Sequence, residues 1–145
     1  MSIIAAPPDV LRWSPRSQGH GDCAVAALEL ACGVTYEVAL AAAISTNPHT
    51  LTSGMTWAAI RKAAQFLGFT TSLKQYYNLE EDTGILNVWQ ARHKPTSDHV
   101  VFLWEGRIIE PRYDRRQLWL DAAQYITHYK YTAGGLLIMT QLTAR

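Results

Sequence analysis

In the first half of the chain, the spacing of hydrophobic residues or a high content of alanine and leucine indicates helices. Three stretches predict helices: 23–32, 36–44 and 55–67. The first is rich in alanine and leucine, and the third places apolar residues from Trp57 to Leu67 near one helical face. Gly33, Asn47-Pro48 and Gly68 stand where these helices should end, because glycine suits a helix C-terminus and proline breaks a helix.

The second half of the chain alternates between apolar and polar residues, as strands do. The stretches that predict strands are 69–76, 85–89, 99–104, 107–110 and 135–142. Glu105-Gly106 is typical of a hairpin turn between two of them. Residues 117–129 predict a helix, with Leu118, Ala122 and Tyr125 on one side. Helices that precede strands indicate an α+β fold with an antiparallel sheet.

The length of 145 residues fits a single globular domain. Residues 1–17 are rich in proline and are interpreted as an extended arm, and residues 18–145 as the domain. The formal net charge of +1 argues against a nucleic-acid-binding protein, which normally carries a basic patch or stripe. It also argues against a polybasic membrane anchor. The sequence has no apolar run long enough to span a membrane, and residues 1–8 do not resemble a signal peptide. We therefore expect a cytoplasmic protein, or one carried within a larger particle, without a nucleic-acid partner.

The two cysteines, Cys23 and Cys32, have different expected roles. On one helix their Cα atoms would lie about 13 Å apart, beyond the roughly 7 Å that a disulfide allows. Two thiols at this spacing also lack the pattern of a zinc site. Cys32 falls on the helical face opposite Cys23 and is expected to be a small buried residue. No metal or organic cofactor is expected.

Cys23 is the candidate nucleophile. It follows a turn that contains Gly19 and Gly21, so its sulfur should be accessible. If Asp22 caps the helix, Cys23 lies in the first helical turn, where the partial positive charge stabilises the reactive thiolate. In an acyl-transfer reaction, the backbone N–H of Cys23 and the side-chain amide of Gln18 would donate to the developing oxyanion.

His99 is the preferred candidate for the general base among the five histidines. It opens an apolar strand, and a strand end places the ring rigidly at the edge of the sheet, where a helix N-terminus can face it. The other histidines lie in loops or near the ends of elements: His20, His49, His93 and His128.

The general base needs an acceptor that fixes its tautomer and stabilises the imidazolium. Glu110 ends the strand that should pair with the strand of His99, so a short hairpin would bring its carboxylate near the ring. Asp98 is a poor alternative, because neighbouring residues of a strand point to opposite faces. Asp114 stays open as an alternative if the loop after Pro111 folds back.

These residues also resemble a known family. Gln18, followed by the run Asp22-Cys23-Ala24-Val25-Ala26-Ala27-Leu28, is similar to the nucleophile segment of papain-like cysteine peptidases. The branch that it resembles most is the bacteriocin-processing peptidases, which remove double-glycine leader peptides. Other segments resemble that branch in the same order: 33–37, 57–68, 84–89, 98–103 and 108–111. The resemblance implies a papain-like fold and cleavage of a peptide or protein after small residues.

Two other functions stay open. Cell-wall hydrolases and amidases of the papain-like group, found in bacteria and phages, also place a cysteine on a helix and a histidine at a strand start. A non-catalytic peptide-binding module is the second, because Glu110 replaces the usual aspartate and Gln18 stands nearer the cysteine than is usual in the family. The pair Cys23 and His99 favours catalysis. The aromatic stretch 125–131 and the proline-rich start could serve a larger assembly.

Overall fold

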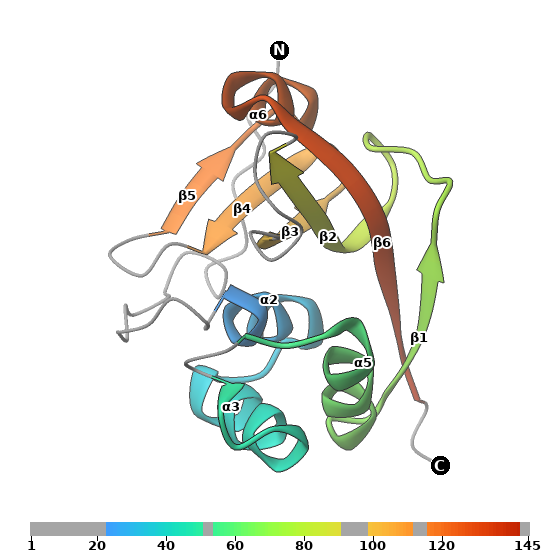
Figure 1. Cartoon of the computed structure of the whole chain (residues 1–145). Coiled ribbons are helices and arrows are strands. Elements are labelled where there is room, and N and C mark those ends of the chain that lie inside the picture. Colours follow the sequence, from blue (N-terminus) through green and yellow to red (C-terminus); the bar gives the residue numbers. More distant parts are fainter. Residues whose placement is uncertain (1–22, 51–53, 91–98, 112–115, 143–145) are drawn as a thin grey trace.

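The computed structural model describes residues 23–50, 54–90, 99–111 and 116–142 (Figure 1). The helices α2 (Cys23–Cys32), α3 (Tyr36–Thr46) and α5 (Trp57–Phe66) come first. They are followed by β1 (Phe69–Lys74), β2 (Thr83–Gln90), β3 (His99–Trp104), β4 (Arg107–Pro111), β5 (Arg116–Trp119), α6 (Ala122–Tyr129) and β6 (Tyr131–Gln141). This order confirms the predicted α+β class.

Local caps set the ends of the helices. At the starts of α3 and α5, the side chains of Thr35 and Thr56 each accept a hydrogen bond from the backbone N–H three residues on. α2 ends at Cys32, and the next residue, Gly33, has a φ of +66° and an N–H that donates to the carbonyl of Glu29. The three helices predicted in the first half are therefore confirmed, with small differences at their ends.

The strands form one six-stranded antiparallel sheet in the order β1-β6-β2-β3-β4-β5. β3 and β4 make the predicted hairpin, and its turn residues Glu105 and Gly106 have φ values of +46° and +86°. Two consecutive positive φ values are the signature of a type I′ turn, which matches the twist of the strands that it joins. The turn fixes the register, so Phe102 lies opposite Ile109.

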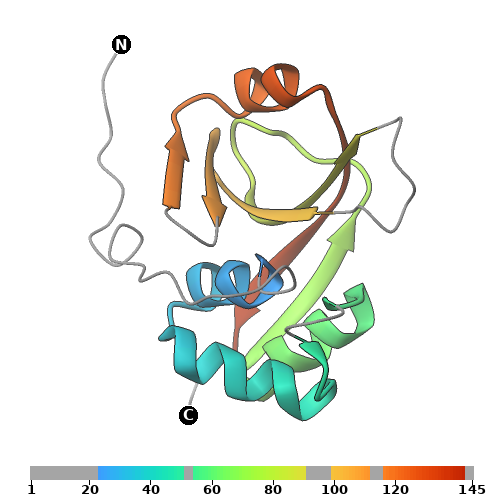
Figure 2. The same ribbon diagram turned by 60° about the vertical axis from the view of Figure 1, so that its left-hand side comes forward.

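The two faces of the sheet support separate hydrophobic cores. Ile85 and Val100 pack with residues of α2, α3 and α5. Their neighbours along the same strands, Leu86 and Val101, point to the other face and pack with α6. Figures 1 and 2 show α2 between the sheet and α3, with α6 at the opposite end of the molecule.

The prediction of one helix over residues 117–129 is wrong in its first part. β5 occupies that part, and only the rest is helical as α6. β5 pairs with β4, with Leu118 opposite Ile109, and this pairing outweighs the helical spacing of the sequence. The side chain of Asp121 then accepts hydrogen bonds from two backbone N–H groups in the first turn of α6 and sets its start.

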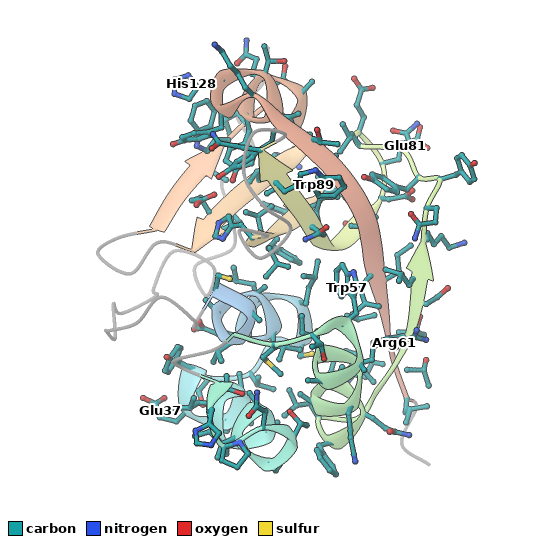
Figure 3. The ribbon with its side chains drawn as sticks, in the orientation of Figure 1. Glu37, Trp57, Arg61, Glu81, Trp89 and His128 are labelled. Carbon is teal, nitrogen blue, oxygen red and sulfur yellow. The ribbon has the colours of Figure 1, made fainter. Side chains whose placement is uncertain are left out.

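The last strand starts earlier than the predicted range of 135–142, because β6 begins at Tyr131. Gly134 and Gly135 interrupt the alternation and hide the first part of the strand. Gly134 is required by packing: a Cβ there would lie 2.5 Å from a ring atom of Trp89. Figure 3 shows Trp89 beside β6.

None of the helices in the described ranges is both long and apolar enough to cross a membrane.

Candidate active site

Cys23 is the first residue of α2, where the positive end of the helix dipole lies. The next residues of the helix, from Ala24 to Leu28, are buried against the sheet and hold this end of α2 in place. Cys23 itself is partly exposed and forms no disulfide. The structure therefore gives its sulfur a rigid support, partial access to solvent and a local positive potential.

His99 is the first residue of β3 and forms a side-chain hydrogen bond with Cys23. Its backbone is held by pairing with Val88 of β2, and its carbonyl accepts a hydrogen bond of 3.4 Å from the side-chain amide of Asn87. The predicted approach of a strand-end histidine to a helix N-terminus is thus present.

Glu110 lies in β4 and contacts the imidazole of His99, with 2.8 Å between Nε2 and Oε2. The hairpin register explains this contact. Phe102 lies opposite Ile109, so the next residue pair of the same register places Glu110 opposite Val101. Val101 and His99 are two residues apart in β3, so Glu110 lies on the same face of the sheet as His99. Since Nε2 faces Glu110, Nδ1 is the ring nitrogen left for the thiol of Cys23. The predicted contact between His99 and Glu110 is confirmed.

The electrostatics of the three side chains favour a charged imidazole. Burial alone lowers the pKa of His99, but the hydrogen bonds and negative charges of Cys23 and Glu110 outweigh it and raise the pKa to about 10. Only 24% of the His99 side chain and 6% of the Glu110 side chain are exposed, so solvent screens these interactions weakly. The arrangement can therefore hold an imidazolium between a carboxylate and a thiolate at neutral pH.

This pKa leads to a prediction on stability at alkaline pH. A histidine whose pKa rises from 6.5 to about 10 on folding stabilises the fold fully below pH 6.5, and loses that contribution as the pH rises through 10. Between pH 7 and 10, we expect the free energy of unfolding of the wild type to fall by about 3–4 kcal/mol more than that of His99→Gln. Urea unfolding across this pH range measures the difference, and parallel curves for the two proteins would contradict the charged pair.

Cys32 behaves as the small buried residue that the sequence predicts. It lies at the end of α2 in the hydrophobic core, and burial raises the pKa of its thiol to about 12. A thiol with this pKa is inert at neutral pH. The reactivity of the two thiols can therefore be compared within one helix, because Cys23 lies beside a histidine and Cys32 lies in an apolar environment.

Several residues singled out from the sequence lie outside the described residues: Gln18, His20, Asp22, His93, Asp98 and Asp114, together with the arm over 1–17. Of the other two histidines, His49 is exposed. His128 lies on α6, away from α2, and its ring contacts that of Trp119 at a centroid distance of 5.2 Å (Figure 3). Within the described ranges, no group of histidine, cysteine and carboxylate side chains is arranged to hold a metal ion.

Two tyrosines at this site are not among the site residues predicted from the sequence. The hydroxyl of Tyr125 donates to Oε1 of Glu110, and Tyr125 is itself hydrogen-bonded to Tyr131. The sequence places Tyr125 on one side of a predicted helix, and both tyrosines in an aromatic stretch that could serve a larger assembly. Tyr125 is fully buried, so it is not available for such a contact, and the assembly stays a prediction.

No protein-family model and no curated protein matches the chain. The resemblance to papain-like peptidases therefore rests on the sequence segments alone.

Proposed function

We propose that this protein is a cysteine peptidase with a papain-like fold, in which Cys23 is the nucleophile and His99 the general base. The observation that carries the proposal is the position of the His99 ring, which is hydrogen-bonded to Cys23 on one side and to Glu110 on the other. A thiol at a helix N-terminus, an imidazole at a strand start and a buried acceptor behind it are the parts that nucleophilic catalysis by cysteine requires.

The reaction proceeds in two stages. The thiolate of Cys23 attacks the carbonyl carbon of a peptide bond, and the charge that forms on its oxygen is held by the backbone N–H of Cys23 and, as the sequence predicts, the amide of Gln18. Imidazolium His99 then donates its proton to the nitrogen as the C–N bond breaks, which releases the amine product and leaves a thioester. Neutral His99 removes a proton from water, which hydrolyses the thioester and regenerates the thiolate pair.

Glu110 supports both stages. Its carboxylate accepts a hydrogen bond from Nε2 of His99, so Nδ1 points toward the thiol and the imidazolium is stabilised while the thioester forms. Glutamate is longer by one methylene than the aspartate that the family usually has. The short distance of 2.8 Å supports Glu110 as a working replacement for that aspartate.

The substrate is proposed from the resemblance to bacteriocin-processing peptidases. It is a peptide or protein cut after small residues such as a Gly-Gly pair, and no metal or organic cofactor takes part. The stem peptide of a bacterial cell wall, cut by an enzyme of the same fold, is the alternative substrate.

Alkylation of the thiols tests the proposal without knowledge of the substrate. Iodoacetamide labelling of the full chain from pH 4 to 10, read for each cysteine by peptide mass spectrometry, compares Cys23 with Cys32. We expect fast labelling of Cys23 at about pH 6, well below the ordinary cysteine pKa of about 8.5, and little labelling of Cys32 in the folded protein.

The matched variant is His99→Ala, which removes the imidazolium and should return Cys23 to slow labelling at pH 6. A wild-type Cys23 that titrates like an ordinary thiol would show that the pair is not assembled. A peptide-binding module without turnover would then be the better account of the fold.

A further inference from the structure

The carboxylate of Glu110 is held on both of its oxygens. Oε2 contacts His99 and Oε1 accepts the hydroxyl proton of Tyr125, while the residue as a whole is only 4% exposed. A buried carboxylate is costly unless hydrogen bonds compensate for lost water. The Tyr125 hydroxyl supplies one such bond, on the side of Glu110 that faces away from His99.

Tyr125 reaches this position through an element that is tied to the hairpin of His99 and Glu110. It lies on α6, and the N–H of Ala122 at the start of that helix donates to the carbonyl of Gly106 in the hairpin turn, at 2.8 Å. This hydrogen bond ties the start of α6 to the strands that carry the site. The same hairpin therefore positions both ends of the hydrogen bond between Tyr125 and Glu110.

The aromatic surroundings fix the Tyr125 ring. It is fully buried and contacts Trp119, Tyr129 and Tyr131, with ring centroids 5.6 Å, 5.2 Å and 5.6 Å away. Burial, together with the nearby Glu110 and Tyr131, raises the pKa of the Tyr125 hydroxyl. The hydroxyl therefore keeps its proton and remains a donor over the whole working range of pH.

We propose, on the basis of the peptidase function proposed above, that Tyr125 is a positioning residue for the Cys23–His99 pair. Its hydroxyl holds the Glu110 carboxylate in the orientation that binds His99, and Tyr131 in turn holds the hydroxyl of Tyr125. The chain of contacts runs from Tyr131 through Tyr125, Glu110 and His99 to Cys23.

This role explains why glutamate can stand where the family usually has aspartate. Glutamate has one more side-chain torsion than aspartate, so its carboxylate would otherwise sample more orientations. A hydrogen bond to the second oxygen removes this freedom. Tyr125 therefore compensates for the extra methylene of Glu110.

The pH profile of Cys23 labelling tests the proposal. Tyr125→Phe keeps the ring and removes only the hydroxyl. Without it Glu110 holds the imidazolium less well, the thiolate loses its counterion, and the labelling midpoint should rise by about one pH unit. At pH values below the wild-type midpoint, labelling of Cys23 should then be about tenfold slower, because one pKa unit changes the thiolate fraction tenfold there.

Tyr77→Phe is the matched control. The hydroxyl of Tyr77 donates to the carbonyl of Gly134 at 2.5 Å and its ring packs against the same core as Tyr125, but its bond does not involve Glu110. Labelling in this variant should stay within about twofold of the wild type. Tyr131→Phe, which removes the hydroxyl that is hydrogen-bonded to Tyr125, should slow labelling about threefold.

The outcomes separate this inference from the proposed function. An ordinary titration of Cys23 in the wild type overturns the peptidase proposal itself. If wild-type Cys23 is activated but labelling is unchanged in Tyr125→Phe, the role of Tyr125 alone is overturned. Equal slowing in Tyr125→Phe and Tyr77→Phe also overturns it, because it would reflect a general loss of packing. If Tyr125→Phe does not fold, Tyr131→Phe decides: a threefold slowing supports the chain of contacts, and labelling at the wild-type rate overturns it.

Discussion

Replacing Cys23 by alanine is expected to reduce peptide cleavage by about 10⁴-fold or more, because the acyl intermediate forms on its sulfur. The test substrates are a series of peptides with Gly-Gly or other small residues before the scissile bond. A purified peptidoglycan preparation is incubated with the enzyme in parallel. Mass spectrometry of the products measures cleavage in both and identifies the bond that is cut. Products from the peptides support the leader-peptidase type of substrate, and products from peptidoglycan support the cell-wall alternative.

Cys32→Ala is the control for loss of a thiol. Cys32 is buried at the end of the same helix with an inert thiol, so its replacement should leave the cleavage rate within about twofold while lowering stability by about 1 kcal/mol. If Cys23→Ala still cleaves at the wild-type rate, Cys23 is not the nucleophile. Loss of cleavage in Cys32→Ala, with the fold retained, would contradict the distinction between the two thiols.

The contact between His99 and Glu110 could be predicted because it depends on local structure. Glu105-Gly106 specifies a two-residue turn, and the turn specifies which residues of β3 and β4 lie opposite one another. Once the register is set, the period of two along each strand places both side chains on one face. The identity of the candidate base and its acceptor therefore follows from about a dozen consecutive residues.

The position of Tyr125 could not be predicted in the same way. Residues 117–129 have the spacing of one helix, and β5 forms only because β4 offers it an edge to pair with. Which side chains of α6 reach Glu110 depends on how that helix docks on the sheet, through contacts between residues far apart in the chain. The capping residue Asp121 was the available signal that the helix starts late, and its carboxylate does accept N–H groups of the first turn.

The activation of Cys23 lies between these two cases. Its place at the start of α2 could be predicted from the local sequence, because the alanine-rich run begins directly after a turn that contains Gly19 and Gly21. Its hydrogen bond with His99 requires α2 to pack across β3, which buried side chains of both elements determine. The sequence identifies Cys23 and His99 as candidates, but the contact between them depends on how the core packs.

Replacing Glu110 by alanine should have the second-largest effect, on stability and activity together. The change leaves the hydroxyl of Tyr125 and the ring of His99 without their acceptor in a buried site, so we expect the free energy of unfolding to fall by about 2–4 kcal/mol. Cleavage should fall by about 10²-fold or more, because neither the tautomer nor the charge of His99 is then fixed.

Glu110→Gln separates orientation from charge. Glutamine has nearly the same volume, and its carbonyl oxygen can still accept one hydrogen bond, so we expect a stability loss of about 1 kcal/mol and a roughly tenfold loss of cleavage. Urea unfolding and the cleavage rate, measured on both variants, give the comparison. If Glu110→Ala cleaves within tenfold of the wild type, Glu110 does not orient the base. If Glu110→Gln loses as much activity as Glu110→Ala while remaining stable, the negative charge, rather than the hydrogen-bond acceptor, is what His99 requires.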